Sequence, residues 1–152
     1  SLRRNARLRE VGTANIIDGM LAAGARRLIA QSIAWLYADG SLPHTEEDPL
    51  IDPASQPDHV SLPGVLALER LVTTTPGIDG LVLRYGSLYG PGTVSEEPQP
   101  GPTSVHVAAA ARAAELAVTR GEPGIYNVVD EGGAVSPARA RRVLGWDPEQ
   151  RS

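Results

Sequence analysis

Three residue types are missing from this chain of 152 residues: cysteine, phenylalanine and lysine. Without cysteine, the chain has no disulfide, no cysteine metal site and no thiol nucleophile. Without phenylalanine, and with only 4% aromatic residues, its core must come from leucine, valine, isoleucine and alanine. Hydrophobic residues make up 41% of the sequence, which is enough for a core in a chain of this length. We therefore expect residues 1–152 to form a single domain.

All fourteen cationic side chains are arginines, and the net charge is −4. Seven of the arginines gather at residues 3–9 and 139–142, a pattern that nucleic-acid-binding proteins also use. Because the chain is acidic overall, solvated helix faces explain these clusters better, and we expect no nucleic-acid partner. No apolar run approaches the roughly 18 residues of a membrane span, and no signal peptide is visible. We expect a soluble cytoplasmic protein with no membrane partner.

Apolar periodicity and turn residues predict alternating helices and strands. The expected helices span residues 5–25, 64–74, 105–120 and 136–144. The expected strands span residues 28–35, 81–85 and 124–129. Alternation of this kind predicts an α/β fold with a parallel sheet. Three strands leave two sheet edges, so we expect a homo-oligomer or a larger fold to cover them.

Six segments of the chain follow one another in a characteristic order. They are VGTANIIDGMLAAGARRLIAQSIAWLYA, ALERLV, LVLRYGSLYGPGT, SVHVAAAARAAELAV, GIYNVVDE and ARARRVLGWDP. In this order they resemble the NAD-dependent epimerase/dehydratase family, the extended short-chain dehydrogenase/reductases. The resemblance covers nearly the whole chain and implies a partial Rossmann-like parallel sheet with flanking helices.

Members of that family begin with a glycine-rich turn that holds the cofactor pyrophosphate at a helix N-terminus. No such turn precedes Asn5. The resemblance therefore implies that residues 1–152 are the C-terminal half of the fold, without the cofactor-binding half. Residues 94–103 and 130–135 stand where the family has longer segments. NAD or NADP is then the expected cofactor of a longer parent chain, and a complete chain of this length would bind none.

The family's chemistry uses a Tyr-x-x-x-Lys pair, in which the ammonium lowers the pKa of the phenol, and a Ser or Thr beside the reacting oxygen. Alignment through Glu69 puts the Tyr position at Ser61 and the Lys position at Val65. The Ser or Thr position, four residues before Tyr37, falls at Ile33. Because the chain contains no lysine, we expect the Ser-Tyr-Lys machinery to be absent and its catalytic residues to be unknown.

Open α/β sheets bind ligands outside the carboxyl ends of their strands. The resemblance places nicotinamide and substrate contacts after the second predicted strand, in the stretch RYGSLYG. The expected cofactor-binding residues are Ser32, Tyr85, Gly86 and Ser87. The expected substrate-binding residues are Tyr37, Tyr89 and His106. For these side chains a purely structural role is the alternative, and Trp35 is expected in the core.

Two further groups of residues give only weak signals of a metal site or a catalytic site. His44 lies close to the acidic residues 46–48, but their spacing matches no specific metal site. His59 precedes Ser61 by two residues in a proline-rich loop, which is not the arrangement of a catalytic triad. We therefore expect no metal ion and no serine nucleophile.

The sequence predicts a diverged NAD(P)-dependent epimerase/dehydratase-type protein. Its substrate would be a sugar nucleotide or another small hydroxyl or carbonyl compound. The alternative is a cofactor-free remnant. That remnant would be a homodimeric binding or assembly module, joined through a sheet edge, or a cofactor-independent isomerase or cyclase. Dimerisation and failure to bind a dinucleotide would favour the alternative.

Overall fold

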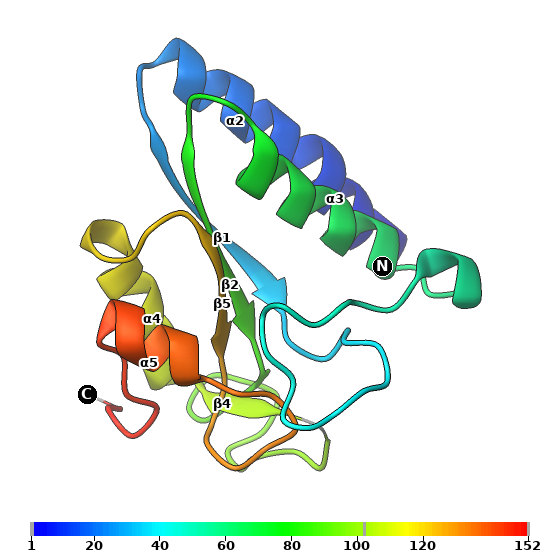
Figure 1. Cartoon of the computed structure of the whole chain (residues 1–152), viewed down its shortest axis with the longest axis vertical. Coiled ribbons are helices and arrows are strands. Elements are labelled where there is room, and N and C mark those ends of the chain that lie inside the picture. Colours follow the sequence, from blue (N-terminus) through cyan, green and yellow to red (C-terminus); the bar gives the residue numbers. More distant parts are fainter. Residues whose placement is uncertain (1, 102, 152) are drawn as a thin grey trace.

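The structure, a computed structural model, describes residues 2–101 and 103–151. Its central element is a parallel sheet of three strands in the order β1-β2-β5. The strands are β1 (Arg27–Ile33), β2 (Asp79–Tyr85) and β5 (Gly124–Val128). Helices cover both faces of this sheet, as Figure 1 shows. The expected α/β fold, with a parallel sheet and flanking helices, is therefore confirmed.

On one face, α3 packs against the sheet, and a longer helical segment lies alongside α3 (Figure 1). The helices of this side are α1 (Leu2–Arg7), a π-helical turn (Leu8–Gly12), α2 (Thr13–Ala22) and α3 (Leu62–Thr74). The junctions between the first three keep helical backbone angles, so these three form one continuous rod. α3 buries Leu68 and Val72 against Val82 of β2. Its apolar stripe is the one that the sequence pattern predicted.

The opposite face of the sheet is covered by α4 (Val107–Thr119) and α5 (Ala138–Leu144). Alanine has the highest helix propensity of all residues, which explains why this alanine-rich segment is helical. Ala109, Ala113 and Ala117 recur every four residues, lie on one face of α4 and are fully buried. Their small side chains let α4 pack closely on the sheet.

The last helix begins at Ala138 rather than at residue 136, and its N-cap position is Pro137, which makes no side-chain capping hydrogen bond. The Ser136 Oγ accepts a hydrogen bond from the Ala138 N–H at 3.3 Å. At the other end, Gly145 has a φ of 67°, in the left-handed region that glycine adopts without strain.

A second, two-stranded parallel sheet was not predicted. It pairs β3 (Ser87–Tyr89) with β4 (Ser104–His106). Because residues 104–106 form a strand, α4 begins at Val107 rather than at Val105. Strands of three residues are too short to show an alternating pattern in the sequence.

Several other boundaries differ from expectation by a few residues. The first helical segment spans residues 2–22 rather than 5–25, and β1 ends at Ile33. Trp35 therefore lies beyond the strand and is 41% exposed, so its expected place in the core was wrong. Among residues 2–101 and 103–151, no helix is long and apolar enough to cross a membrane.

Candidate functional site

A row of polar side chains crosses the sheet near its carboxyl end. Ser32, Arg84 and Asn127 occupy paired positions on the three neighbouring strands and are all buried. Glu69 of α3 binds two of them. Its Oε1 accepts hydrogen bonds from Ser32 Oγ at 2.6 Å and Arg84 Nε at 2.9 Å, and its Oε2 accepts one from Arg84 Nη2 at 2.7 Å. The row therefore faces α3 and contains a bidentate ion pair.

Tyr37 extends this polar row towards β5. Its hydroxyl accepts a hydrogen bond from Arg84 Nη1 at 2.8 Å and donates one to Asn127 Oδ1 at 2.7 Å. Burial raises the pKa of Tyr37. Burial alone would lower the pKa of Arg84, but its hydrogen bonds and charge attraction to Glu69 outweigh this and raise it. Tyr37 is therefore held as a neutral phenol beside a charged guanidinium.

Glu46 completes the row at the open edge of β5. Its Oε1 accepts the backbone N–H of Asn127 at 2.7 Å. Burial raises the pKa of Glu46 above its ordinary value. An exposed strand edge is a template for unwanted pairing, and this side chain occupies part of it. The polar row thus ties the sheet, α3 and the loop after β1 together.

A cavity of about 570 Å³ lies at the carboxyl ends of β1 and β2, and we call it the strand-end cavity. Its wall is formed by the end of β1, the β2–β3 connection, the loop after β3 and the start of α4. The lining residues are Gln31, Ile33, Trp35, Tyr85, Gly86, Ser87, Leu88, Gly92, Thr93, Val94, Gln99 and Val107. Its size falls in the range of small-molecule sites, and its place is where open α/β sheets bind ligands.

The strand-end cavity has little capacity for acid–base chemistry. Tyr85 is the one titratable side chain among its lining residues. The Tyr85 hydroxyl donates to the Ala110 carbonyl at 2.9 Å, and burial raises the pKa of Tyr85 to about 12. A phenol in this state neither releases a proton near neutral pH nor points its proton at a ligand. The cavity can hold and orient a ligand, but its lining contains no side chain that exchanges a proton with the ligand near neutral pH.

The lining fits the nicotinamide end of a dinucleotide. Ile33, Trp35 and Val107 give flat apolar walls, which suit an aromatic ring. The side chains of Gln31 and Ser87 make no hydrogen bond within the described residues. They could bind the carboxamide of such a ring.

Gly86 is glycine because of the protein's own packing. A Cβ on Gly86 would lie 2.6 Å from Thr103 Oγ1 and 2.6 Å from the Ser104 carbonyl carbon. The absence of a side chain at Gly86 therefore allows β4 to pack against the connection between β2 and β3. Contact with a nicotinamide at Gly86 stays a prediction.

The structure separates the predicted site residues into three groups, of which the third, Tyr89 and His106, lies at β3 and β4. Tyr85, Gly86 and Ser87 line the strand-end cavity. Ser32 and Tyr37 instead lie in the polar row, where neither is more than 8% exposed. Their roles in binding cofactor and substrate stay predictions, but in this arrangement their hydroxyls are already bonded to protein.

Tyr89 and His106 lie at the paired strands β3 and β4. The Tyr89 hydroxyl accepts from Arg151 Nη2 at 3.1 Å, and burial raises the pKa of Tyr89. His106 Nδ1 accepts the Ala108 N–H at 3.2 Å and so caps α4. The two rings meet edge to face with centroids 5.2 Å apart. Neither residue lines the strand-end cavity.

The three positions aligned with the family's catalytic residues do not form a cluster of polar groups. Ile33 lines the strand-end cavity. Val65 is 1% exposed and packs with Ile33 and Leu62 in an apolar cluster. Ser61 immediately precedes α3, and its side chain makes no capping hydrogen bond.

The sequence interpretation missed several lining residues, among them Gln31, Thr93 and Gln99. Gln31 and Ile33 flank Ser32, and neighbouring strand residues point to opposite faces. The alternation of β1 could therefore have identified Gln31. No sequence signal identifies Thr93 and Gln99, because the path of the loop after β3 depends on the β3–β4 pairing.

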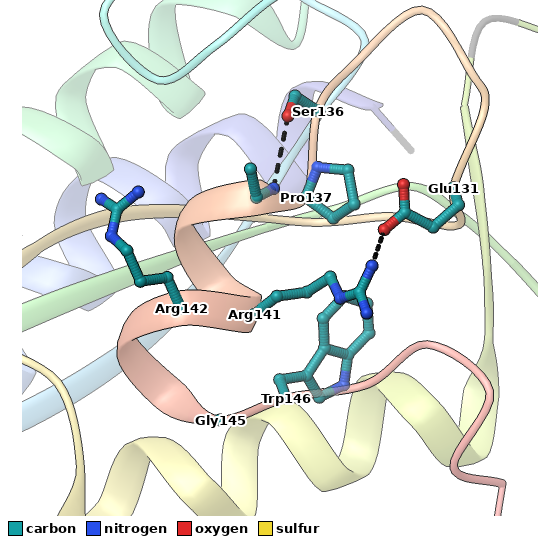
Figure 2. A pocket seen from close by; sticks show the side chains of 8 residues that line it. Glu131, Ser136, Pro137, Arg141, Arg142, Gly145 and Trp146 are labelled. Atoms are coloured by element: carbon teal, nitrogen blue, oxygen red, sulfur yellow. Dashed lines mark hydrogen bonds and ion pairs between the residues drawn. The ribbon is translucent and has the colours of Figure 1, made fainter.

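A second cavity of about 520 Å³ lies on the outer side of α5, and Figure 2 shows its lining. Arg141 points towards Glu131 and forms an ion pair with it, whereas Arg142 points to the other side of the helix. The Trp146 Nε1–H donates to the Ala109 carbonyl at 2.8 Å and fastens the end of α5 to α4. Of the two arginines in this lining, Arg141 thus has an ion-pair partner on the loop after β5.

No family model matches the sequence. The chain is 50% identical over 92 residues to a curated protein of Streptomyces sp, a 3-diazoavenalumate denitrifying reductase. The match covers 59% of this chain and 30% of that protein. The matched stretch thus spans less than a third of the length of this relative.

Several solved structures share the fold. RMD from Pseudomonas aeruginosa complexed with NADPH has a TM-score of 0.79 at 20% identity, over 98% of this chain and 70% of that one. UDP-glucose 4-epimerase from Thermotoga maritima with UDP-glucose has a TM-score of 0.74 at 16% identity. The likeness covers 98% of this chain and 67% of that one. dTDP-glucose 4,6-dehydratase from Streptomyces venezuelae with NAD and TYD has a TM-score of 0.72 at 17% identity, over 95% and 62%. The chain therefore has the Rossmann-like α/β fold of epimerases and dehydratases.

Proposed function

We propose that this chain forms the substrate side of an NAD(P)-dependent reductase of the epimerase/dehydratase family. The strand-end cavity would hold the nicotinamide ring and the substrate together. The observation that carries the proposal is an apolar cavity at the carboxyl ends of β1 and β2 whose one titratable lining group, Tyr85, is bonded to the protein. The fold shared with NADPH- and NAD-bound structures supports the cofactor.

The substrate class follows from what the cavity can supply. Reduction of a carbonyl leaves an oxyanion that needs a proton or an ion pair, which Tyr-x-x-x-Lys enzymes provide. This chain contains no lysine, and Tyr85 cannot donate near neutral pH. A hydride acceptor that needs no proton suits this cavity better. The similarity to a denitrifying reductase of a diazo compound supports an aromatic diazo substrate.

A bound NAD(P)H would supply a hydride, and the electron pair of that hydride would form the new C–H bond. The C–N bond would break, and N₂ would leave with the electron pair of that bond. The exchange consumes no proton. Within it, Gln31 and Ser87 would orient the carboxamide of the nicotinamide. Trp35 and Ile33 would cover the reacting rings and exclude water. The protein would then contribute by orienting the two reactants and by excluding water from them.

A sugar nucleotide is the competing substrate, since it is bound in the epimerase structure. A sugar ring carries several hydroxyls, each of which needs a polar partner when it is buried. The cavity lining offers few such partners, because apolar residues such as Ile33, Leu88 and Val107 form much of it. The aromatic diazo compound is therefore preferred.

The test is reduction of benzenediazonium by NADPH or NADH carrying deuterium at nicotinamide C4. The expected result is protein-dependent release of N₂, with deuterium on the ring carbon that carried the diazo group. Ser87→Ala should slow the reaction about threefold to tenfold by removing one orienting hydrogen bond. The matched control is Ser55→Ala, since Ser55 is exposed in a short 3₁₀ turn outside the cavity.

Tyr85→Phe should keep the full rate, because the hydroxyl bonds to Ala110 and not to the ligand. A rate equal to the protein-free background contradicts the diazo proposal. Turnover of UDP-glucose or dTDP-glucose with the same cofactor would show that the substrate is a sugar nucleotide and not a diazo compound.

A second candidate function is a homodimeric binding module without cofactor. The observation that favours it is the long helical rod, where Leu8 is 59%, Val11 44% and Ile16 59% exposed. A second copy of the chain would cover these side chains. Ile16→Glu should then convert a dimer to a monomer in analytical ultracentrifugation, whereas Val118→Glu, an exposed apolar position on α4, should not. A monomeric wild-type protein contradicts this candidate. Pairing through a sheet edge stays a prediction.

A further inference from the structure

The three histidines of the chain use their ring nitrogens differently. His59 Nδ1 accepts the Leu62 N–H at 3.2 Å, and His106 Nδ1 accepts the Ala108 N–H at 3.2 Å. A backbone N–H can only donate, so in the neutral rings the proton of His59 and of His106 must sit on Nε2. Both histidines thus serve the first turn of a helix.

His44 has the opposite arrangement. Its Nδ1 lies 3.2 Å from Asp48 Oδ2. The same oxygen accepts the Thr45 N–H at 2.9 Å, and this backbone hydrogen bond lowers the pKa of Asp48. An ionised carboxylate can only accept, so Nδ1 of a neutral His44 must carry the proton. Its Nε2 then carries a lone pair that accepts no hydrogen bond within residues 2–101 and 103–151. In His59 and His106 the accepting nitrogen is Nδ1, and it is already bonded to a backbone N–H.

His44 is fixed although it lies in a long loop. Its backbone N–H donates to the Ala134 carbonyl at 2.8 Å, and its carbonyl accepts the Ser136 N–H at 2.8 Å. Its ring stacks on Tyr37 with centroids 5.0 Å apart and an angle of 11°. Tyr37 is itself held by the polar row. The ring position is therefore set by two separate parts of the fold, as a binding group requires.

His44 lines a cavity of about 290 Å³, which we call the histidine cavity. Its lining residues are Ala34, Trp35, Tyr37, Asp39, Leu42, His44, Ala134 and Val135. Trp35 contributes to this wall and to the wall of the strand-end cavity, so the two cavities adjoin there. Two aromatic rings and several aliphatic side chains suit a small planar ring.

We propose that the histidine cavity binds a neutral aromatic hydroxyl compound, whose ring lies against Trp35 and whose hydroxyl donates to His44 Nε2. Asp48 acts as the positioning residue that holds the ring with Nε2 free. The site is separate from the hydride-transfer function and does not depend on it.

The charges around the cavity select this ligand class. A carboxylate ligand would meet Asp39 in the wall and Asp48 behind the histidine, and both repel an anion. A metal ion would need more donors, and the described residues contain no group of three or more His, Asp or Glu side chains placed to hold one. A neutral hydrogen-bond donor on a flat ring meets both the lone pair and the apolar walls.

The test is a titration of ¹⁵N-labelled protein with phenol at about pH 8, above the ordinary histidine pKa of about 6.5. Two-bond ¹H–¹⁵N correlation spectra report the tautomer of each histidine. We expect a proton on Nδ1 in His44, and on Nε2 in His59 and His106. Phenol should shift the His44 Nε2 resonance in a saturable way and leave the other two histidines unchanged. Toluene, which has the ring but no hydroxyl, should not shift His44 Nε2.

His44→Gln should weaken phenol binding about threefold to tenfold, the worth of one hydrogen bond. His59→Gln is the matched control and should bind phenol as the wild type does. The ring environment of Trp146, which is 2% exposed, reports whether each variant is folded. A proton on Nε2 of His44, equal phenol affinity in His44→Gln, or tighter binding of benzylamine than of phenol would overturn the proposal.

Discussion

The two sides of the sheet's carboxyl end differ in what their polar groups do. Towards α3, Ser32, Arg84 and Glu69 are buried and bonded to one another. In the strand-end cavity, Gln31 and Ser87 have side chains without a hydrogen bond in the described part of the chain. Groups with strong acid–base or ionic character are thus used for structure, while the open side keeps weakly polar groups. The difference indicates a cavity built to hold a ligand rather than to exchange protons with it.

The largest expected effect comes from breaking the polar row. Glu69→Leu should destabilise the protein by about 3–5 kcal/mol, because it leaves Arg84 as an uncompensated buried charge. The double variant Glu69→Leu, Arg84→Met should recover most of this loss. Denaturant unfolding measures the free energy of unfolding of the single and the double variant. Glu115→Gln, which breaks an exposed ion pair with Arg112, is the control and should change the stability by less than about 1 kcal/mol.

The second effect concerns alkaline pH. The pKa of Tyr85 is raised to about 12 in the folded protein, from an ordinary value of 10.0. A raised pKa gives stability that is fully present below pH 10 and lost as the pH rises through about 12. The contribution is at most about 3 kcal/mol. Tyr85→Phe should therefore show a shallower loss of unfolding free energy between pH 9 and 11. An unchanged slope would mean that the Tyr85 hydroxyl is exposed to solvent.

A third change tests why the loop after β2 contains glycine. Gly86→Ala should cost about 1–3 kcal/mol, because its Cβ would meet Thr103 and the Ser104 backbone. Gly101→Ala is the control, since a Cβ there meets no atom within 4 Å. Chemical denaturation of the two variants measures the difference. Equal stability of both variants would show that β4 does not pack against Gly86.

The smallest effect on stability is expected at Trp35. Because this side chain is 41% exposed, Trp35→Ala should cost about 1 kcal/mol or less. The same variant should bind reduced nicotinamide mononucleotide about twofold to tenfold more weakly, as expected for loss of one aromatic contact. Calorimetry compares the affinities. Unchanged affinity would remove Trp35 from the ligand site.

The order of elements was predictable because each helix and strand carries its own local pattern. α3 and α4 show apolar or alanine-rich stripes, and β2 contains the apolar run LVL at residues 81–83. The β3–β4 sheet was not predictable, since its strands have three residues each and pair across a proline-rich loop.

The site was predictable only in part. The carboxyl ends of parallel strands indicate where a ligand binds. The family resemblance implied a role there for Tyr85, Gly86 and Ser87, and these three residues line the strand-end cavity. The bonding of Ser32 to Glu69 joins residues 37 positions apart, which no local pattern reveals. The sequence suggests reactive hydroxyls, but only the packing of α3 on the sheet decides which are already bonded.

The most direct test of the strand-end cavity is fluorine NMR of protein labelled with 5-fluorotryptophan. The chain has two tryptophans, one at the cavity and one in the core, Trp35 and Trp146. Titration with reduced nicotinamide mononucleotide should shift the Trp35 resonance in a saturable way and leave Trp146 unchanged. A Trp35 resonance that stays fixed to saturating ligand, or an equal shift of both tryptophans, would contradict nicotinamide binding in this cavity.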